Sequence, residues 1–215
     1  MNTRTKEAIR YLGYGNHAVD DQTLALVEDS FRELDRAADK RIIYRIFGVT
    51  LEETNSIVIG KLNIVSRNLY RNLRDCGEAV LLGATLGVGV DLLMKRYSLT
   101  DMSKAVVIQA AAAAMLEEYL DECQQQLSRE FEKEGKYLRP RFSPGYGDFD
   151  IGHQGMILRM LNADKSIGLT MTDSCMLTPT KSVTAVIGIS DKKERCPVKG
   201  CESCDKRDCI YRRDT

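Results

Sequence analysis

A long helical pattern, from Asp101 to about Glu134, constrains the fold of this sequence more than any other feature. Thr100 and Asp101 stand at its start as residues that can cap a helix, and Gly135 follows its end. Five consecutive alanines occupy residues 110–114. Because alanine favours helix and has a small side chain, we expect one long helix that another element approaches closely.

Shorter helical and extended patterns flank this segment. Apolar residues at helical spacing predict helices, whereas alternating or continuous apolar runs rich in β-branched residues predict strands. The predicted helices are residues 22–41, 62–74 and 154–161, and the predicted extended segments are residues 41–47, 79–82, 169–172 and 182–189. This mixture favours an α+β fold over a regular doubly wound sheet.

The glycines of the segment 79–91 invite a nucleotide-binding interpretation. Gly83, Gly87 and Gly89 follow a predicted strand, but they do not form the G-x-G-x-x-G pattern of a dinucleotide-binding turn. We therefore interpret them as positions where a helix packs closely against a strand.

Composition and charge limit the class of protein. The 215 residues suit one domain, which we place at residues 1–190, followed by a cysteine-rich tail at residues 191–215. Lysine plus arginine equals aspartate plus glutamate at 31 each, so the overall charge gives no reason to expect nucleic-acid binding. No apolar run approaches the ~20 residues of a membrane span, and the N-terminus lacks a secretory signal pattern. We expect a cytoplasmic protein.

The segment from Arg141 to Asp148 has the composition of a ligand-binding loop. Arginine presents a planar fork of donors that matches a carboxylate, proline fixes the chain direction, and glycine lets a ligand touch the backbone. Tyr146 can cover an adenine or a sulfonium. A surface turn gathers the same residue types, so spacing alone leaves both interpretations open.

The motif Arg141-x-x-x-Gly145-Tyr146 resembles the S-adenosylmethionine-binding signature of the activation domain of cobalamin-dependent methionine synthase. In that family the motif follows a long helix and precedes a helix, a Leu-Thr-Glu-Ser-like strand and a Pro-x-x-Ser-Val stretch. The matching features here are LeuThrMetThrAspSer at residues 169–174, then Pro179, Ser182 and Val183. The resemblance spans roughly residues 105–189 and implies helices packed around a mainly antiparallel sheet.

The resemblance also implies a set of ligand contacts. Arg141 would hold the methionine carboxylate, and Tyr146 would pack against the edge of the ligand. The backbone of Ser143, Pro144 and Gly145 would accept the amino group or the ribose. Where the family has paired tyrosines near its last strand, this chain offers the backbone of Val183 and Thr184. We expect no catalytic residue, because a sulfonium is already a good leaving group and positioning supplies the catalysis.

One family contact is missing. The residues Glu118-Tyr119-Leu120 match a segment of the family's long helix, but Ala114 stands where the family has a ligand-contacting glutamate one turn earlier. We expect ligand binding to rest mainly on residues 141–146.

In the family, cobalamin in the cob(II) state is reactivated by one electron and a methyl group from S-adenosylmethionine. The corrinoid-binding signature Asp-x-His-x-x-Gly does not occur, since neither His17 nor His153 has an aspartate two residues earlier. The resemblance therefore implies the activation subunit of a split methionine synthase, a methyltransferase of methionine biosynthesis. Its partners would be a corrinoid-binding methionine synthase chain and an electron donor such as a flavodoxin or ferredoxin. The alternative is a non-catalytic S-adenosylmethionine sensor or a metal-dependent interaction protein.

Four of the seven cysteines crowd into the tail with the spacing C-x4-C-x2-C-x4-C. Four thiolates suit tetrahedral zinc, and the first three spacings are also those of plant-type iron–sulfur proteins. Disulfides or free thiols are the remaining alternative, and a reducing compartment disfavours the disulfides. The predicted metal ligands are Cys196, Cys201, Cys204 and Cys209.

Overall fold

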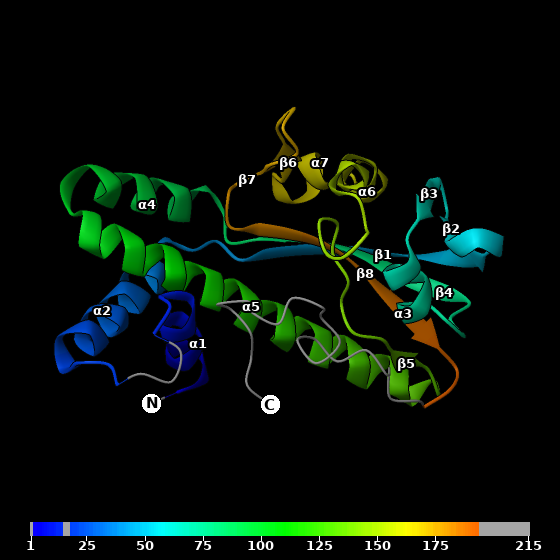
Figure 1. Cartoon of the computed structure of the whole chain (residues 1–215), viewed down its shortest axis with the longest axis horizontal. Coiled ribbons are helices and arrows are strands. Elements are labelled where there is room, and N and C mark those ends of the chain that lie inside the picture. Colours follow the sequence, from blue (N-terminus) through cyan, green and yellow to red (C-terminus); the bar gives the residue numbers. More distant parts are fainter. Residues whose placement is uncertain (1, 15–17, 194–215) are drawn as a thin grey trace. The chain divides into compact units, whose positions relative to one another are not determined.

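The computed structural model describes residues 2–14 and 18–193, and the four tail cysteines lie outside the described residues. Helices and strands alternate irregularly along the chain (Figure 1). The helices are α1 (Thr3–Tyr11), α2 (Asp21–Ala37), α3 (Arg67–Asn72), α4 (Val88–Thr100), α5 (Met102–Lys133), α6 (Gln154–Leu161) and α7 (Ala163–Ile167), with short 3-10 turns η1 (Glu53–Asn55) and η2 (Ile151–His153). The strands are β1 (Arg41–Leu51), β2 (Ser56–Ile59), β3 (Leu62–Val65), β4 (Glu78–Thr85), β5 (Tyr137–Leu138), β6 (Thr170–Met171), β7 (Leu177–Thr178) and β8 (Ser182–Ser190).

The long helix predicted from the sequence is confirmed as α5. The Asp101 carboxylate accepts a hydrogen bond from the Lys104 amide at 3.0 Å and so caps its first turn. Gly135 follows with a φ of 73°, the left-handed conformation that commonly ends a helix. The predicted helices at residues 22–41 and 154–161 are confirmed as α2 and α6.

Six strands form one sheet in the order β3-β2-β1-β4-β8-β5, and each neighbouring pair is antiparallel. The predicted strands at 41–47, 79–82 and 182–189 are confirmed as β1, β4 and β8, whereas residues 170–171 pair with β7 in a separate small sheet. Strand β4 lies between two strands and is buried from Ala79 to Thr85, which accounts for its continuous apolar run from Ala79 to Leu82. The α+β class and the antiparallel sheet are therefore confirmed.

The helix predicted at residues 62–74 is wrong in its first four residues. Residues Leu62–Val65 form β3, which pairs with β2 across a turn at Gly60, where φ is 56°. Buried and exposed side chains alternate along β3, which is the pattern of a strand with one buried face. The helix starts only after Ser66, whose hydroxyl caps α3 through the Leu69 amide at 3.0 Å.

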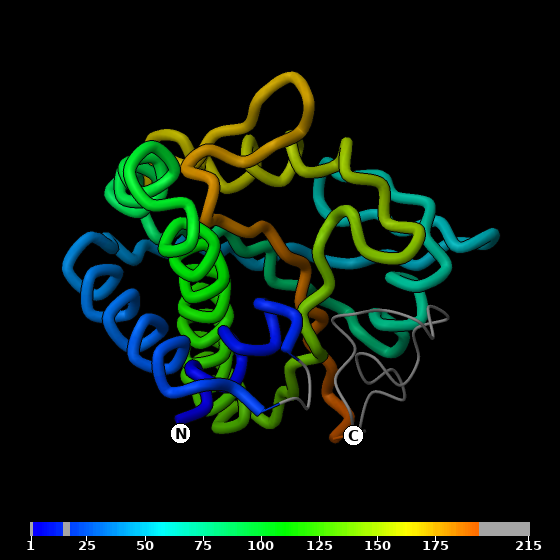
Figure 2. The backbone as a smooth tube through the Cα atoms, turned by 60° about the vertical axis from the view of Figure 1, so that its left-hand side comes forward, coloured from blue at the N-terminus to red at the C-terminus, as the bar shows by residue number. Residues whose placement is uncertain are grey.

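The chain divides into two compact units, which we describe separately. The first includes Met1–Lys40 and Leu86–Asp121 and is helical (Figure 2). Within it the Lys104 ammonium bonds the carboxylate of Asp29 at 2.7 Å and that of Glu33, and Tyr97 donates to Glu33 at 2.8 Å. These bonds tie α2, α4 and α5 together.

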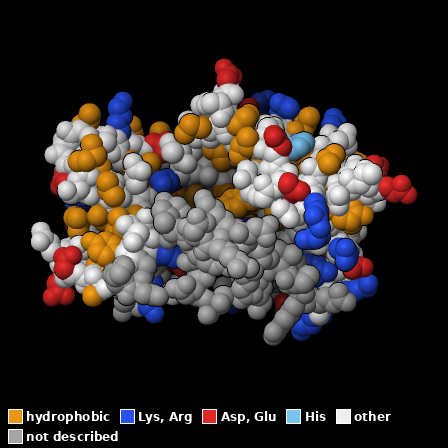
Figure 3. Space-filling view, in the orientation of Figure 1, with side chains coloured by type: hydrophobic (Ala, Val, Ile, Leu, Met, Phe, Trp, Pro, Cys, Tyr) orange, Lys and Arg blue, Asp and Glu red, His pale blue; other side chains and the backbone are white. Residues whose placement is uncertain are grey.

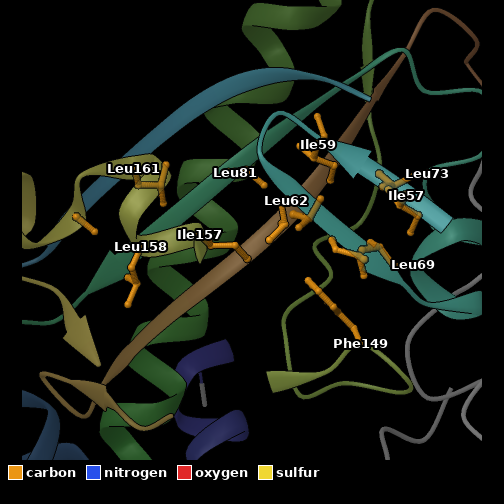
Figure 4. Packing of buried hydrophobic residues seen from close by; sticks show 14 of the residues in the cluster. Ile57, Ile59, Leu62, Leu69, Leu73, Leu81, Phe149, Ile157, Leu158 and Leu161 are labelled. Atoms are coloured by element: carbon orange, nitrogen blue, oxygen red, sulfur yellow. The ribbon is translucent and has the colours of Figure 1, made fainter. Parts of the chain in front are cut away.

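The second unit includes Arg41–Thr85 and the described residues from Glu122 onwards, and it contains the whole sheet. Helices α6 and α7 cover one face of the sheet and pack against β1, β4 and β8 (Figure 1). Their apolar side chains join those of β2, β3, α3 and β4 in one core (Figure 4). Phe149, which follows the Arg141–Asp148 segment, is 1% exposed and belongs to the same core.

The glycines of residues 79–91 are close-packing positions, but the predicted packing of a helix against a strand is confirmed only at Gly83 of β4, since Gly87 and Gly89 pack against the end of α2 and the residues after it. A Cβ on Gly83 would lie 3.3 Å from the Leu161 side chain, and one on Gly87 would lie 3.0 Å from the Asp39 carbonyl oxygen. A Cβ on Gly89 would overlap the carbonyl of Ala37. Separately, none of the described helices has the length and apolarity needed to cross a membrane.

Candidate functional site

The segment carrying the Arg141-x-x-x-Gly145-Tyr146 motif is attached to the edge of the sheet. Phe142 and Val186 of β8 exchange two backbone hydrogen bonds of 2.9 and 2.8 Å and form an antiparallel bridge. Beyond this bridge, Ser143 to Asp148 form a loop, and Phe149 returns the chain to the core. The Phe142 and Phe149 rings stack with their centroids 6.3 Å apart, so both ends of the loop are held.

The loop uses its own amide groups internally. The Gly145 amide donates to the Phe149 carbonyl at 2.7 Å, and the Tyr146 amide donates to the Ser143 carbonyl at 3.2 Å. Gly145 has a φ of 91°, which a residue with a side chain rarely adopts. Gly145 is exposed, whereas Pro144 is buried, and neither carbonyl accepts a backbone hydrogen bond from a described residue. A ligand can therefore reach the loop at Gly145.

The far end of the loop is anchored to α3 through Asp148. Its carboxylate accepts from the Ser66 hydroxyl at 2.6 Å, the Arg67 amide at 2.7 Å and the Asn68 amide at 3.1 Å. Desolvation alone would raise the pKa of Asp148, but these hydrogen bonds outweigh it and lower the pKa. At Gly147, φ is 55°, which favours glycine, and a Cβ would also displace the end of the Asn68 side chain.

Gln124 of α5 positions the arginine of the motif. The half-buried Arg141 guanidinium donates from Nη1 to Gln124 Oε1 at 2.8 Å, and Gln124 Nε2 donates to the Arg139 carbonyl at 3.2 Å. The sequence analysis did not single out Gln124, because it is the first of three consecutive glutamines and no local pattern distinguishes it. A neutral amide thus orients the arginine without adding a negative charge.

Tyr146 lies within the loop, and His153 follows it in the chain. Tyr146 is 66% exposed, so its ring is available to cover a bound molecule. The His153 ring lies 5.7 Å from the Phe149 ring and packs against its side.

The strand residues Val183 and Thr184 lie just before the Phe142–Val186 bridge. In such a bridge Val186 turns its N–H and C=O towards Phe142, and residues two apart on a strand face the same neighbour. Thr184 therefore directs its backbone groups to the edge beside the loop, whereas Val183 directs them to β4. No described strand pairs with that edge at Thr184. The Thr184 side chain is buried, and its hydroxyl donates to Gln154 Oε1 at 3.3 Å.

The structure thus brings together residues 141–146 and the backbone of Thr184 in the second unit. The site therefore combines a cation, a backbone acceptor and an exposed aromatic ring. Within residues 2–14 and 18–193, no three histidine, cysteine or acidic side chains gather in the manner of a metal site.

Comparisons with known proteins identify the family and the fold. Residues 79–213 match the family described as "Vitamin B12 dependent methionine synthase, activation domain". Among solved structures, the chain is similar to the "Crystal Structure of the MetH Reactivation Domain bound to AdoHcy", with 14% sequence identity and a TM-score of 0.62 over 88% of this chain and 76% of that chain. No curated protein sequence matches. The resemblance inferred from the sequence is confirmed at the level of the family, and the fold is shared with the reactivation domain.

Proposed function

The chain belongs to the family of vitamin B12 dependent methionine synthase activation domains, and on that premise we propose that it is the activation subunit of a split cobalamin-dependent methionine synthase. It binds S-adenosylmethionine at the loop of residues 141–146 and presents the methyl group for reductive methylation of cob(II)alamin carried by a partner chain, a reaction that consumes one electron and releases S-adenosylhomocysteine. The observation that carries the proposal is the loop itself, which holds the family's motif beside an open strand edge.

Each part of the loop has one task in this proposal. Arg141, oriented by Gln124, binds the methionine carboxylate with charge-assisted hydrogen bonds. The carbonyls of Pro144 and Gly145 accept from the ammonium or the ribose, next to the backbone of Thr184. Tyr146 covers the ligand on the solvent side.

The chemistry needs positioning and no general acid or base from this chain. S-adenosylmethionine supplies a methyl group on a sulfonium, and reductive methylation of cob(II)alamin consumes that methyl group together with one electron. The residues of the loop fix the direction in which the methyl group points, and orientation of this kind can supply a large part of a rate enhancement. The anchoring of both loop ends supports this role.

The proposal includes two partners and a metal site. A corrinoid-binding methionine synthase chain supplies the cobalamin, and a flavodoxin or ferredoxin supplies the electron. In the tail of residues 191–215, the four cysteines bind zinc or an iron–sulfur cluster. Metal analysis and a visible spectrum of anaerobically prepared protein distinguish these two, and a sample with neither metal contradicts this part of the proposal.

Calorimetric titration of S-adenosylmethionine tests the binding site. We expect Arg141→Ala to weaken binding by roughly 100-fold, since a hydrogen bond to a charged group contributes up to about 3 kcal/mol. Arg129→Ala, which removes an exposed arginine from α5, is the matched control and should leave binding unchanged. Equal affinities of wild type and Arg141→Ala would overturn the assignment of the site.

The partner is tested by co-purification with the corrinoid-carrying chain from the same cells. Recovery of that chain, and loss of cobalamin reactivation when this protein is deleted, are the expected results. Normal reactivation in the deletion strain, or binding of S-adenosylmethionine that instead controls attachment to DNA, would favour a sensor.

A further inference from the structure

A buried polar pair lies in the core next to the open edge of β8. The Thr184 hydroxyl donates to Gln154 Oε1 at 3.3 Å, and the two residues are only 1% and 5% exposed. The next residues of α6 that face the core, Ile157, Leu158 and Leu161, are all apolar (Figure 4). Two apolar side chains of the same shape could replace such a pair at little or no cost in stability. Filling the core therefore does not by itself account for the pair.

The backbone of Gln154 is fixed to the end of the ligand loop. Gln154 opens α6 directly after the turn η2, which the Asp150 carboxylate caps through the Gly152 amide at 2.7 Å. The ring of His153 lies 5.7 Å from that of Phe149, where the loop returns to the core. Because these contacts hold the short segment between Phe149 and Gln154, the position of Gln154 follows that of the loop's end.

The NH2 group of Gln154 holds the β6–β7 hairpin. Nε2 donates to the carbonyl of Cys175 at 2.8 Å, in the turn of the hairpin. Each strand of this hairpin has only two residues, and so small a hairpin has little stability of its own. In Figure 3 it stands out above α6 and α7, with an acidic side chain at its tip. One side-chain amide thus links the hairpin, the start of α6 and β8.

Thr184 connects this support to the edge where the ligand would bind. Its side chain reaches Gln154 of α6, while its backbone groups face the edge beside the loop. The side chain and the backbone of one residue turn together about the strand axis. The hydrogen bond to Gln154 therefore fixes the direction in which the backbone groups of Thr184 point.

We infer that Gln154 is a positioning residue of the S-adenosylmethionine site and sets the gap between the loop at Gly145 and the backbone of Thr184. The inference rests on the proposed function, in which the ligand binds between these two places. Hydrogen bonds to backbone groups weaken steeply outside donor–acceptor distances of about 2.7–3.2 Å. A small change in the gap would therefore lower affinity although every contact residue is still present. Gln154 acts through Thr184 and does not itself contact the ligand.

Three single variants of the full chain test the pair. Gln154→Met keeps the length of the side chain and removes both of its hydrogen bonds, and Thr184→Val keeps the shape of the side chain and removes the hydroxyl. Thr184→Ser keeps the hydroxyl. In calorimetric titrations with S-adenosylmethionine, we expect the dissociation constant to rise roughly 5-fold in Gln154→Met and in Thr184→Val. Thr184→Ser should stay within roughly 2-fold of wild type.

A double variant and a control separate positioning from a general loss of stability. Because Gln154→Met already removes the bond to Thr184, adding Thr184→Val should weaken binding by no more than roughly 2-fold further. Ile59→Val removes one methyl group from the same core on β2, which β1 and β4 separate from β8. It should lower the melting temperature by about 3 °C and leave the dissociation constant unchanged.

Four outcomes would contradict the inference. Wild-type affinity in both Gln154→Met and Thr184→Val overturns it and leaves the assignment of the ligand site intact. Additive losses in the double variant, or a Thr184→Ser protein that binds as weakly as Thr184→Val, show that the bond between the hydroxyl and the amide is not the cause. Weaker binding by Ile59→Val, in step with its melting temperature, assigns the effect to stability alone. If wild type binds no S-adenosylmethionine, the proposed function itself is wrong, and the inference with it.

Discussion

Replacing Asp148 by asparagine should weaken the attachment of the loop to α3, at the end of the loop that contacts no proposed part of the ligand. In the wild type, Oδ1 accepts from Ser66 and Asn68, and Oδ2 accepts from the Arg67 amide. An asparagine oxygen can keep the first pair of bonds, but its NH2 group would then face the Arg67 N–H, and two donors cannot bond each other. The substitution also removes the negative charge from the start of α3.

The expected loss of stability follows from these contacts. A hydrogen bond to a charged group contributes about 1.5–3 kcal/mol, and we take the lower end because the site is in contact with solvent. For a chain of this size a loss of about 1.5 kcal/mol lowers the melting temperature by about 3–6 °C. Asp173→Asn, at an exposed position of the β6–β7 turn, is the control and should change stability by less than ~0.5 kcal/mol.

The pH dependence has a defined sign. Desolvation raises the pKa of Asp148, but the hydrogen bonds from Ser66, Asn68 and Arg67 prevail and lower it in the folded protein. Its contribution is therefore fully present above the unfolded-state value of about 3.9, and it is lost as the pH falls through the lowered folded-state pKa. In urea titrations, the difference between wild type and Asp148→Asn should be constant from about pH 7 to pH 5 and shrink below about pH 4.

Equal stability of wild type and Asp148→Asn at pH 7 would refute the reasoning. So would a difference that grows on acidification. Because Asp148 fixes the end of the loop, calorimetry should also show weaker S-adenosylmethionine binding in Asp148→Asn than in Asp173→Asn. Unchanged binding would mean that the loop keeps its shape without this anchor.

Three further substitutions test separate parts of the structure. Gln124→Leu removes the acceptor that orients Arg141, so the dissociation constant for S-adenosylmethionine should rise about 5- to 10-fold in calorimetry; an unchanged constant would exclude this positioning role. Gly147→Ala adds a steric collision to a left-handed φ and should lower the free energy of unfolding by about 2 kcal/mol or more. Gly135→Ala, at a left-handed position with open space around it, should lower it by about 1 kcal/mol. Equal losses in thermal melts would argue against a steric contribution at Gly147. Lys104→Met should cost about 1–2 kcal/mol at pH 7. Desolvation lowers the pKa of Lys104, but its hydrogen bonds to two carboxylates prevail and raise it in the folded protein. The difference in stability between wild type and Lys104→Met should therefore persist at pH 10, near the unfolded-state pKa, and narrow only at higher pH. A stability difference that is already lost at pH 9 would contradict this.

The sequence predicts those parts of the fold whose signals are local. The helix α5 has caps and a long run of good helix formers, and β4 is a continuous apolar run, so neither depends on distant residues. The prediction for Leu62–Val65 is wrong because a segment of four residues, three of them apolar, suits either a helix or a strand. Its pairing with β2 across Gly60, which lies outside the window, decides in favour of a strand.

In the candidate site, too, only the residues that are close together in the sequence can be predicted from it. The Arg141–Tyr146 motif is contiguous, so the sequence alone brings it to notice. The residues that hold it in place are far away along the chain: Asp148 bonds Ser66 across 82 positions, and Gln124 reaches Arg141 from a different helix. No periodicity or spacing connects such residues, and only the folded backbone brings them together.

Some residues of the site hold the loop in place and others would contact the ligand, so substitutions in the two groups should differ in their effects on stability and affinity. Asp148 and Gly147 contact the fold and no proposed part of the ligand, so changes there should lower stability and ligand affinity together. Tyr146 is mostly exposed, so its substitution should lower affinity while leaving the melting temperature nearly unchanged. If Tyr146→Ala destabilised the protein as much as Asp148→Asn does, the loop would be part of the core and could not be the preorganised, solvent-facing site that methyl presentation requires.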